Sequence, residues 1–521
     1  MTTKKNIRIW EPLLVGLAAA IGLIAGYNMN FDNAGHKLLD IPEIKENYSG
    51  KADGRIEEIL RFIESNYVDS LDQKIISIDA VRHILRQLDP HSDYIGEDEL
   101  TDHNEKMEGA YRGIGIETLK LKDTFYVTKV IEHGPAYKAG LKLGDAIISV
   151  DNQLVSGNQK SFSSVRDLLK AEDKNKLELS VIPFGEKSKE TRAVEISSIN
   201  LSSAELSYMP DESTVYVKLE RFSDNTYEQF IESLDYYMKD NDNLNLILDL
   251  RNNPGGYLPE AIKILSQLFK EKDKLLTYTE GMNRKKAEYR TTGKNFYTIN
   301  KLAILINEYS ASGSEILAGA VQDWDRGVVI GQESFGKGLV QEIFPLRNGG
   351  ALRLTVAKYY TPSGRLIQKS YRSINKDFEA DSVDYQTRLL NRKVLSGNGI
   401  VPDYIIDETE DLKCRNYLSY LDFFILNKML ETASLQVDTD EITRQEYARF
   451  LENNFELETS YFEDSCPVSK FQRILESRYV RLISGEKEYI KKLNEGDPFI
   501  QKALLFIQDQ KTTLAYLSEK N

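Results

Sequence analysis

The sequence predicts a multidomain α+β protein built around a layered α/β core. Its 521 residues exceed what one hydrophobic core normally holds. An apolar strand, a small-residue turn and a helical stretch occur in that order twice, at residues 246–269 and 302–321, as is typical of a layered core. Helical periodicity dominates the flanking regions. We therefore divide the chain into residues 1–30, 31–106, 107–200, 201–406 and 407–521.

The N-terminal segment predicts a membrane anchor. Lys4, Lys5 and Arg8 precede an uncharged stretch, residues 12–30, whose apolar part covers residues 13–27. Positive charges ahead of an apolar segment hold the N-terminus inside and send the rest of the chain outward. The apolar part is shorter than the ~20 residues of a usual spanning helix, so a cleaved signal peptide stays open as the alternative.

A helical region and a small mixed domain are expected next. Between residues 54 and 105, apolar residues recur at helical spacing and predict two helices, the second of which ends at the proline-containing turn LDPHS, residues 88–92. Residues 111–183 then read as a mixed α/β domain. Its predicted strands and helices cover residues 125–130, 135–145, 146–150 and 163–171.

A serine and a lysine both stand at strand ends in the second strand-turn-helix unit. The apolar strand at residues 302–306 stops at a turn that holds Ser310, Ser312 and Ser314, and Glu315 then lies in the first helical turn, where the helix dipole favours an anion. A second strand, ending at Gly331, leads into SFGKG, which contains Lys337. Neighbouring strands of one sheet can bring such residues together as a serine nucleophile and a lysine base. A lysine serves as base only if desolvation lowers its pKa.

The first strand-turn-helix unit contains a glycine turn. The strand at residues 246–250 leads into DLRNNPGG, residues 249–256, and then into a helix at residues 259–269. A phosphate-binding loop is a poor interpretation, because the G-x-x-x-x-G-K-[ST] spacing is absent and Pro254 removes an amide donor.

Composition and motif content exclude several classes of function. A net charge of −14 argues against a nucleic-acid partner. No C-x-x-C or H-E-x-x-H pattern occurs, so we expect no metal and no cofactor. The 5 histidines lie in the first quarter of the chain, so the histidine of a Ser-His-Asp triad would have to come from another domain.

The C-terminal region is expected to be helical and to carry no catalytic residues. Helices are predicted at residues 441–453 and from Asp497, where Pro498 suits the first helical position. Cys414 and Cys466 either pair in an oxidising compartment or remain buried thiols. The region is expected to pack on the core or to mediate assembly.

Several motifs, in their expected order, resemble the carboxyl-terminal processing (tail-specific) proteases. They are the turn SASGSE, the loop GKGLVQ, and the segments DLRNNPGG, LDPHS, YYTPSGRLIQ and GNGIVPD. The resemblance implies that Ser312 is the nucleophile, Lys337 the general base and Gln341 the residue that orients the lysine. Gly313 departs from the family pattern, in which many members have alanine.

The same resemblance implies binding roles for backbone amides. In the family the glycine turn helps to form the oxyanion hole, which assigns Gly255, Gly256 and Gly313 to that role. The motifs GIGI and GPAYKAGLKLGD resemble a PDZ domain of the circularly arranged bacterial kind. That domain implies a peptide carboxylate bound by the amides of Ile114, Gly115 and Ile116.

The implied protein is a serine endopeptidase with a PDZ domain placed before the protease core. It would be anchored in a bacterial inner membrane, face the periplasm and cleave envelope proteins that it recognises by their C-termini. An adaptor protein and a homo-oligomer stay open as partners. The alternative function is that of a catalytically inactive PDZ scaffold.

Overall fold

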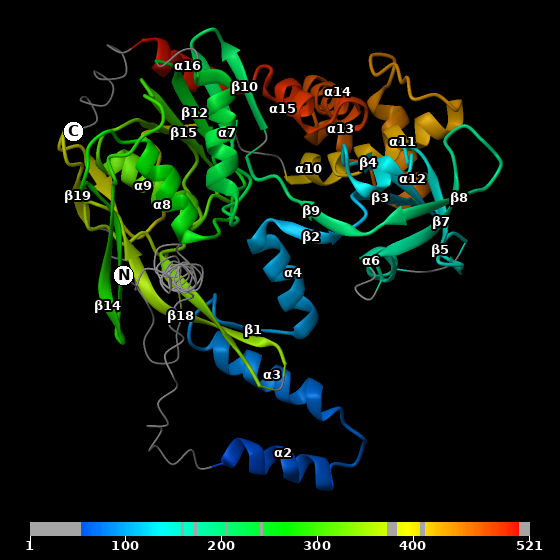
Figure 1. Cartoon of the computed structure of the whole chain (residues 1–521), viewed down its shortest axis with the longest axis horizontal. Coiled ribbons are helices and arrows are strands. Elements are labelled where there is room, and N and C mark those ends of the chain that lie inside the picture. Colours follow the sequence, from blue (N-terminus) through cyan, green and yellow to red (C-terminus); the bar gives the residue numbers. More distant parts are fainter. Residues whose placement is uncertain are drawn as a thin grey trace, which may run out of the picture. The chain divides into compact units, whose positions relative to one another are not determined.

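The computed structural model describes residues 54–157, 161–170, 174–204, 206–239, 243–347, 349–371, 383–406 and 412–509 (Figure 1). The predicted membrane anchor lies outside these residues. Within the described ranges no helix has both the length and the apolar character needed to cross a membrane. The chain divides into two compact units, residues 1–77 and 78–521, which are described separately.

The described part of the first unit is helical, as predicted. It contains α2, Arg55–Asn66, and the beginning of α3, Gln73–Arg86. No residue of α2 is buried, and Ile56, Ile59 and Phe62 on this helix are exposed. These side chains, each three residues from the next, lie on one face of the helix, which is therefore apolar and exposed.

A short strand and a helix connect α3 to the small domain. Strand β1, Asp93–Ile95, follows the LDPHS turn and pairs antiparallel with a distant strand, β18, Ala351–Tyr360. Helix α4, Glu97–Glu108, follows, and the Glu99 side chain accepts a hydrogen bond from the Gly96 amide at 3.0 Å to cap it. The sequence did not predict β1, because a three-residue strand is stabilised by its partner and not by its own pattern.

The small domain is a six-stranded antiparallel sheet with two helices, in the predicted order. Its buried interior is formed by apolar residues on alternating strand positions. Strands β2 and β9 pair antiparallel where the chain enters and leaves the domain. The elements are β2 Ala110–Gly113, β3 Ile116–Leu121, β4 Thr124–Val130, α5 Pro135–Lys138, β5 Ala146–Val150, β6 Gln153–Leu154, α6 Phe162–Lys170, β7 Lys176–Ile182, β8 Glu190–Glu195 and β9 Ser197–Asn200.

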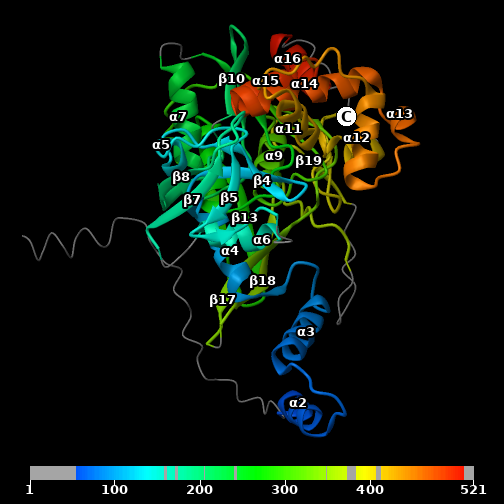
Figure 2. The same ribbon diagram turned by 90° about the vertical axis from the view of Figure 1, so that its right-hand side faces the viewer.

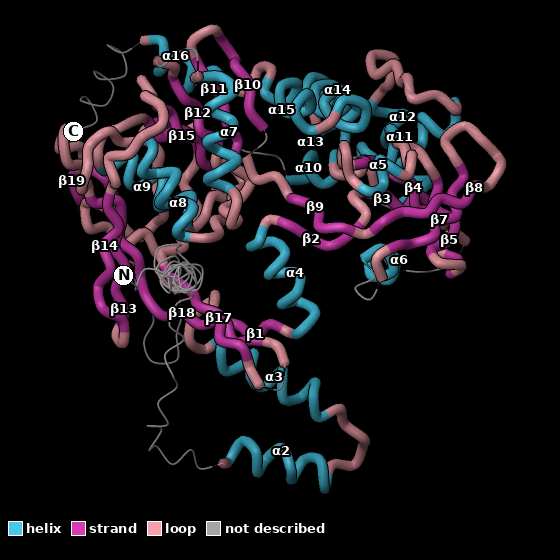
Figure 3. Tube along the Cα trace, viewed as in Figure 1, coloured by secondary structure: helices cyan, strands magenta, loops and turns pink. Residues whose placement is uncertain are grey.

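The core is a layered α/β structure around a second six-stranded sheet (Figures 1 and 3). The sheet order is β10-β11-β12-β15-β16-β21, and all neighbours are parallel except β10 and β11. The strands are β10 Leu206–Asp211, β11 Thr214–Lys218, β12 Asn245–Asp249, β15 Leu302–Ile306, β16 Val328–Gly331 and β21 Tyr404–Ile405. Every residue of β12, β15 and β16 is buried, as expected of strands covered on both faces.

Helices from the middle and from the C-terminal end of the chain cover the two faces of this sheet. Helices α7, Thr226–Met238, α8, Leu258–Gln267, and α9, Gly313–Asp323, pack on one face. Helix α16, Pro498–Gln508, packs on the other through apolar side chains that include Phe499 and Phe506. The C-terminal region therefore completes the α/β core.

A separate five-stranded sheet carries the segment after Lys337. Strand β18 lies between β1 and β13, Leu275–Gly281, and also pairs with β17, Leu339–Pro345. Strand β14, Arg284–Arg290, completes the sheet beside β13. A two-stranded hairpin, β19 Asp384–Gln386 and β20 Lys393–Leu395, lies beyond it in the chain.

The remaining helices form a bundle with a hydrophobic interior of its own (Figure 2). Cys414 and Cys466 form a disulfide within it, with 4.9 Å between the Cα atoms, which decides between the two alternatives left open by the sequence. The bundle also packs on the small domain through Leu121. Its helices are α10 Leu412–Leu418, α11 Leu421–Thr432, α12 Arg444–Phe455, α13 Phe462–Ser465 and α14 Val468–Ser484. Helix α15, Glu486–Asn494, follows and packs with α16 on the core sheet through Ile490.

Two helices near the C-terminus were predicted from the sequence, and both are present. The side chain of Thr443 caps α12, so that helix begins three residues later than expected. The Asp497 carboxylate accepts hydrogen bonds from the amides of Phe499 and Ile500, so the predicted cap of α16 is confirmed.

Candidate active site

Ser312 occupies the turn between β15 and α9. Its φ of 53° and ψ of −110° lie outside the regions that non-glycine residues normally adopt. Strain of this kind persists only where the surroundings enforce it, and it is common at catalytic residues. The turn is held by the buried Ser310, whose hydroxyl donates to the carbonyl oxygen of Leu250 at 2.8 Å.

The DLRNNPGG loop lies directly against this turn. A Cβ atom placed on Gly255 would lie 2.7 Å from the Cβ of Ser312, so only glycine fits there. The carbonyl oxygen of Asn253 accepts hydrogen bonds from the Ala311 amide and the Ser314 hydroxyl, each at 3.0 Å. The two strand-turn-helix units recognised in the sequence therefore meet at Ser312.

The three glycines predicted to form the oxyanion hole differ in their hydrogen bonding. The Gly255 amide already donates to the Asn253 side chain at 2.9 Å, so it is not free for a substrate oxygen. Among the described residues, no backbone or side-chain acceptor takes the amides of Gly256 and Gly313. Gly255 thus brings the loop against Ser312 with its amide already bound, and the assignment of the three glycines to an oxyanion hole stays a prediction.

Glu315 connects the serine turn to the lysine loop. One carboxylate oxygen accepts from the amides of Ser312 at 2.8 Å and Lys337 at 2.9 Å. The other accepts from the Gly336 amide at 2.7 Å and the Ser334 hydroxyl at 2.6 Å. Glu315 is fully buried, and burial raises its pKa to about 7 despite these four donors. The sequence predicted Glu315 only as a helix-dipole anion, because its contacts with the lysine loop depend on the fold.

Lys337 lies in the loop before β17 and is half-buried. The pKa of its ammonium group is lowered from 10.5 to about 8, mainly by burial and in addition by the positive charge of Arg353, whereas Glu315 and Asp89 oppose the shift. The Tyr359 hydroxyl contacts the carbonyl oxygens of Ser312, at 3.2 Å, and of Lys337. About a tenth of this lysine is therefore neutral at pH 7, and about half at pH 8.

Gln341 is the third residue of β17, four residues after Lys337, its predicted partner. Its side-chain amide donates to the Thr355 hydroxyl on β18 at 3.2 Å. No hydrogen bond within the described part of the chain joins Gln341 to the ammonium group of Lys337, nor that group to the Ser312 hydroxyl. Catalytic hydrogen bonds are often long before substrate binds, so this geometry fits a resting site.

The sequence of the chain is similar to that of known peptidases. The profile of peptidase family S41 matches residues 213–380, which contain both Ser312 and Lys337. A carboxy-terminal-processing protease of Bartonella bacilliformis is 32% identical over 320 residues, which make up 60% of this chain and 72% of that relative. The chain belongs to peptidase family S41. It is a serine peptidase, and the resemblance to carboxyl-terminal processing proteases is confirmed.

Two further known proteins are similar to this S41 peptidase. A probable CtpA-like serine protease of Staphylococcus haemolyticus is 30% identical over 335 residues, 64% of this chain and 66% of that protein. A solved structure, the photosystem II D1 C-terminal processing protease, is 24% identical, covers 68% of this chain and 92% of its own, and has a TM-score of 0.35. A PDZ profile matches residues 126–182, within the small domain. The predicted order of a PDZ domain, a protease core and a helical C-terminal region is therefore confirmed.

The PDZ domain of this S41 peptidase contains a pocket of about 460 Å³ at the predicted carboxylate-binding segment. Ile114, Gly115 and Ile116 line it, together with apolar side chains such as Phe125 and Val165. The carbonyl oxygens of Ile114 and Gly115 accept internal hydrogen bonds at 2.9 Å, whereas their amides have no acceptor among the described residues. The pocket can therefore take an apolar side chain beside an anionic group.

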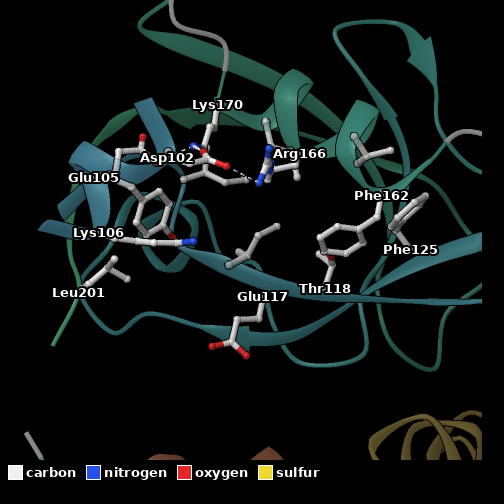
Figure 4. A pocket seen from close by; sticks show the side chains of 17 residues that line it. Asp102, Glu105, Lys106, Glu117, Thr118, Phe125, Phe162, Arg166, Lys170 and Leu201 are labelled. Carbon is white, nitrogen blue, oxygen red and sulfur yellow. Dashed lines mark hydrogen bonds and ion pairs between the residues drawn. The ribbon is translucent and has the colours of Figure 1, made fainter. Parts of the chain in front are cut away.

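Charged residues from outside the PDZ domain border the same pocket (Figure 4). Asp102 on α4 pairs with Arg166 and Lys170 on α6, each at 3.1 Å, and Glu105 pairs with Lys170 at 2.6 Å. Figure 4 shows Lys106 extending from α4 into the pocket, apart from this cluster. Helix α4 thus forms one wall of the pocket, which its sequence did not indicate.

Proposed function

We propose that this S41 peptidase cleaves proteins with a dyad of Ser312 and Lys337. The observation that carries the proposal is the carboxylate of Glu315, which holds the backbone amides of Ser312 and Lys337 through one oxygen atom. The serine turn and the lysine loop are thereby kept as one unit. The lowered pKa of Lys337 supports its role as the base.

In the proposed mechanism the neutral amine of Lys337 accepts the hydroxyl proton of Ser312 as the serine oxygen attacks the scissile carbonyl. The amides of Gly256 and Gly313 donate to the oxyanion of the tetrahedral intermediate. Lys337 then returns the proton to the leaving amine, and an acyl-enzyme on Ser312 remains. Water attacks this ester with Lys337 again as base, and the released carboxyl product restores the serine.

The PDZ pocket supports recognition of the substrate's C-terminus. Strand β3 is at the edge of its sheet, so an extended peptide can pair with it. The free amides of Ile114 and Gly115 would bind the terminal carboxylate, and the apolar floor of the pocket would bind the last side chain. Protein tails with an apolar C-terminal residue are the proposed substrates.

We further propose that the peptidase is anchored in a bacterial inner membrane and faces the periplasm, where it cleaves envelope proteins. The basic residues before the apolar segment at residues 13–27 support this orientation, and the disulfide between Cys414 and Cys466 supports an oxidising compartment. Protease added to spheroplasts should digest the chain after residue 30, and full protection would refute this location.

The deciding experiment compares the wild-type chain with Ser312→Ala on an unfolded protein substrate. We expect cleavage by the wild type, and none by the variant, with equal binding of a substrate tail. Membership of a serine peptidase family disfavours the inactive-scaffold alternative. Cleavage that persists in Ser312→Ala would refute the dyad, and a wild type that binds tails without cleaving would support the scaffold.

A further inference from the structure

The LDPHS turn, residues 88–92, lies outside the segments matched by the PDZ and S41 profiles, and the proposed mechanism does not use it. Its geometry is closely determined by Asp89. One carboxylate oxygen accepts from the amides of His91 at 2.8 Å and Ser92 at 2.9 Å, and the other accepts from the Ser92 hydroxyl at 2.6 Å. Asp89 and Ser92 are buried, so the turn is a rigid support for the His91 side chain.

Strand β18 holds this turn beside the lysine loop. The Thr355 amide donates to the Ser92 hydroxyl oxygen at 3.1 Å, and the Arg353 side chain donates to the His91 carbonyl oxygen at 3.0 Å. Thr355 is also the residue whose hydroxyl accepts from Gln341. A segment from the N-terminal part of the chain is thus hydrogen-bonded to the strand that pairs with β17, directly after the lysine loop.

The His91 ring faces this loop. Its centroid lies 6.4 Å from that of Phe335, two residues before Lys337, with 49° between the ring planes. The pKa of His91 is lowered to about 4, mainly by burial and in addition by the charges of Lys337 and Arg353, whereas Asp89 opposes the shift. The imidazole is therefore neutral at the pH values at which a lysine base works.

We propose that His91 is a positioning residue of the active site, whose neutral ring covers Lys337 on the side of the LDPHS turn and keeps bulk water from its ammonium group. This inference rests on the proposed role of Lys337 as the base. The charged groups around that lysine are Asp89 in the turn, Arg353 on β18 and Glu315 on α9. Asp89 and Glu315 raise the pKa of the lysine, and Arg353 lowers it. Exclusion of water is therefore the main cause of the lowered pKa.

A ring suits this role better than a charged or flexible side chain. Desolvation disfavours the charged form of a lysine only while water stays out, and a rigid planar side chain excludes water without adding a charge. A protonated histidine would be repelled by the charge of Lys337. The low pKa of His91 keeps its ring neutral and so avoids this repulsion. The turn therefore supplies bulk to the site and takes no proton.

The test compares His91→Ala with His91→Phe by measuring kcat/KM between pH 6 and pH 10. In His91→Ala, water reaches Lys337, and we expect the apparent pKa of the rate profile to rise by about one unit with about tenfold lower activity at pH 7. Activity should recover at high pH. His91→Phe keeps the ring and should stay within about twofold of wild type with an unchanged profile. His133→Ala, at an exposed histidine of the PDZ domain, is the matched control.

Two outcomes would overturn the inference. Equal losses in His91→Phe and His91→Ala would mean that an imidazole nitrogen takes part in the reaction. An active His91→Ala variant with an unchanged profile would mean that the ring does not shield Lys337. If His91→Ala fails to fold, His91→Gln replaces it, since a flexible amide cannot seal the site as a ring does.

A readout without hydrolysis separates this inference from the proposed function. In the Ser312→Ala background, the pH dependence of reductive methylation at Lys337, followed by mass spectrometry, reports the protonation of the lysine directly. We expect half-maximal labelling at higher pH in His91→Ala than in His91→Phe. Failure of the Ser312 and Lys337 dyad would leave this difference in place, whereas identical labelling curves would refute the cover even in an active enzyme.

Discussion

The catalytic site and the PDZ pocket place charged groups in opposite environments. At the catalytic site burial dominates, so that the pKa of Glu315 is raised and that of Lys337 is lowered. At the pocket burial acts against the charges of Asp102 and Lys170, but their hydrogen bonds outweigh it, so that the pKa of Asp102 is lowered and that of Lys170 is raised. The first site favours neutral forms and the second favours charged forms.

This difference follows from the role that we propose for each site. A lysine base needs a neutral amine, and only desolvation gives one near neutral pH. A pocket that binds a carboxylate needs stable charges and free amides, and partly exposed ion pairs tolerate exchange with a ligand because each contributes little. Changes at the catalytic site should therefore alter rates and pH profiles, and changes at the pocket should alter binding.

The largest expected effect is that of Lys337→Ala, which removes the proposed base. We expect kcat to fall by at least about 10³-fold, because dyad members act as a unit. In the wild type kcat/KM should rise with pH through about 8, the pKa of Lys337. Binding of a fluorescent tail peptide should be unchanged, and near-normal turnover in the variant would show that another group is the base.

Glu315→Gln should have the next largest effect, since a side-chain amide offers one acceptor oxygen where the carboxylate uses two. The lysine loop should loosen, and we expect a fall in kcat of about 10²-fold with a lower melting temperature. As the control, Glu315→Gln should bind tail peptides as tightly as the wild type does. An unchanged kcat would mean that the two loops keep their positions without this carboxylate.

The pKa of Glu315 also predicts how stability depends on pH. Its folded value of about 7 lies above the reference value of 4.5, so between these pH values the folded state holds a proton that the unfolded state has lost. The contribution of Glu315 to the free energy of unfolding should therefore fall as pH rises from 4.5 to 7. Denaturant unfolding of the wild type and of Glu315→Gln across this pH range measures this contribution. The prediction would be contradicted if the free energies of unfolding of the two proteins changed in parallel with pH.

A smaller effect is expected from amidating the C-terminus of a substrate. Loss of charge-assisted hydrogen bonds, each worth ~1.5–3 kcal/mol, should weaken binding at least about tenfold. Binding of paired acid and amide peptides to Ser312→Ala would measure this without cleavage. Equal affinities would show that the pocket at Ile114 and Gly115 does not read the carboxylate.

The smallest effect should come from Asp102→Asn, which removes the ion pairs of Asp102 with Arg166 and Lys170. Partly exposed ion pairs contribute about 0–1 kcal/mol, so tail binding should change by less than about fivefold. The rate profile on short peptides without a matching tail should stay that of the wild type. A shifted profile would mean that α4 couples the pocket to the catalytic site.

Local patterns predicted the elements of this protein well. Strands β12 and β15, with their glycine and serine turns, were recognisable because apolar runs and turn residues carry their structural preference within a few positions. The cap of α16 at Asp497 was recognisable for the same reason. The assignment of Ser312 and Lys337 came from motifs read in order, and stays a prediction that the geometry supports.

Contacts between distant segments could not be predicted in this way. Sequence patterns do not show which hydrogen-bond acceptor reaches which donor across the chain, so Gly255 was assigned an amide that Asn253 already binds. Gln341 was likewise assigned to the lysine, although it donates to Thr355. The pairing of β1 with β18 brings His91 to the lysine loop. It could not be predicted, because the three residues of β1 are too few to show a periodic pattern.

The sequence by itself determined the order of domains, the strand ends that carry serine and lysine, and the family to which they belong, because these depend on local propensity and motif spacing. Only the tertiary structure decided the protonation of the site. Burial of Glu315, the depressed pKa of Lys337 and the cover proposed for His91 depend on how much water the assembled segments exclude. Desolvation is a property of packing, and no single segment of the chain carries it.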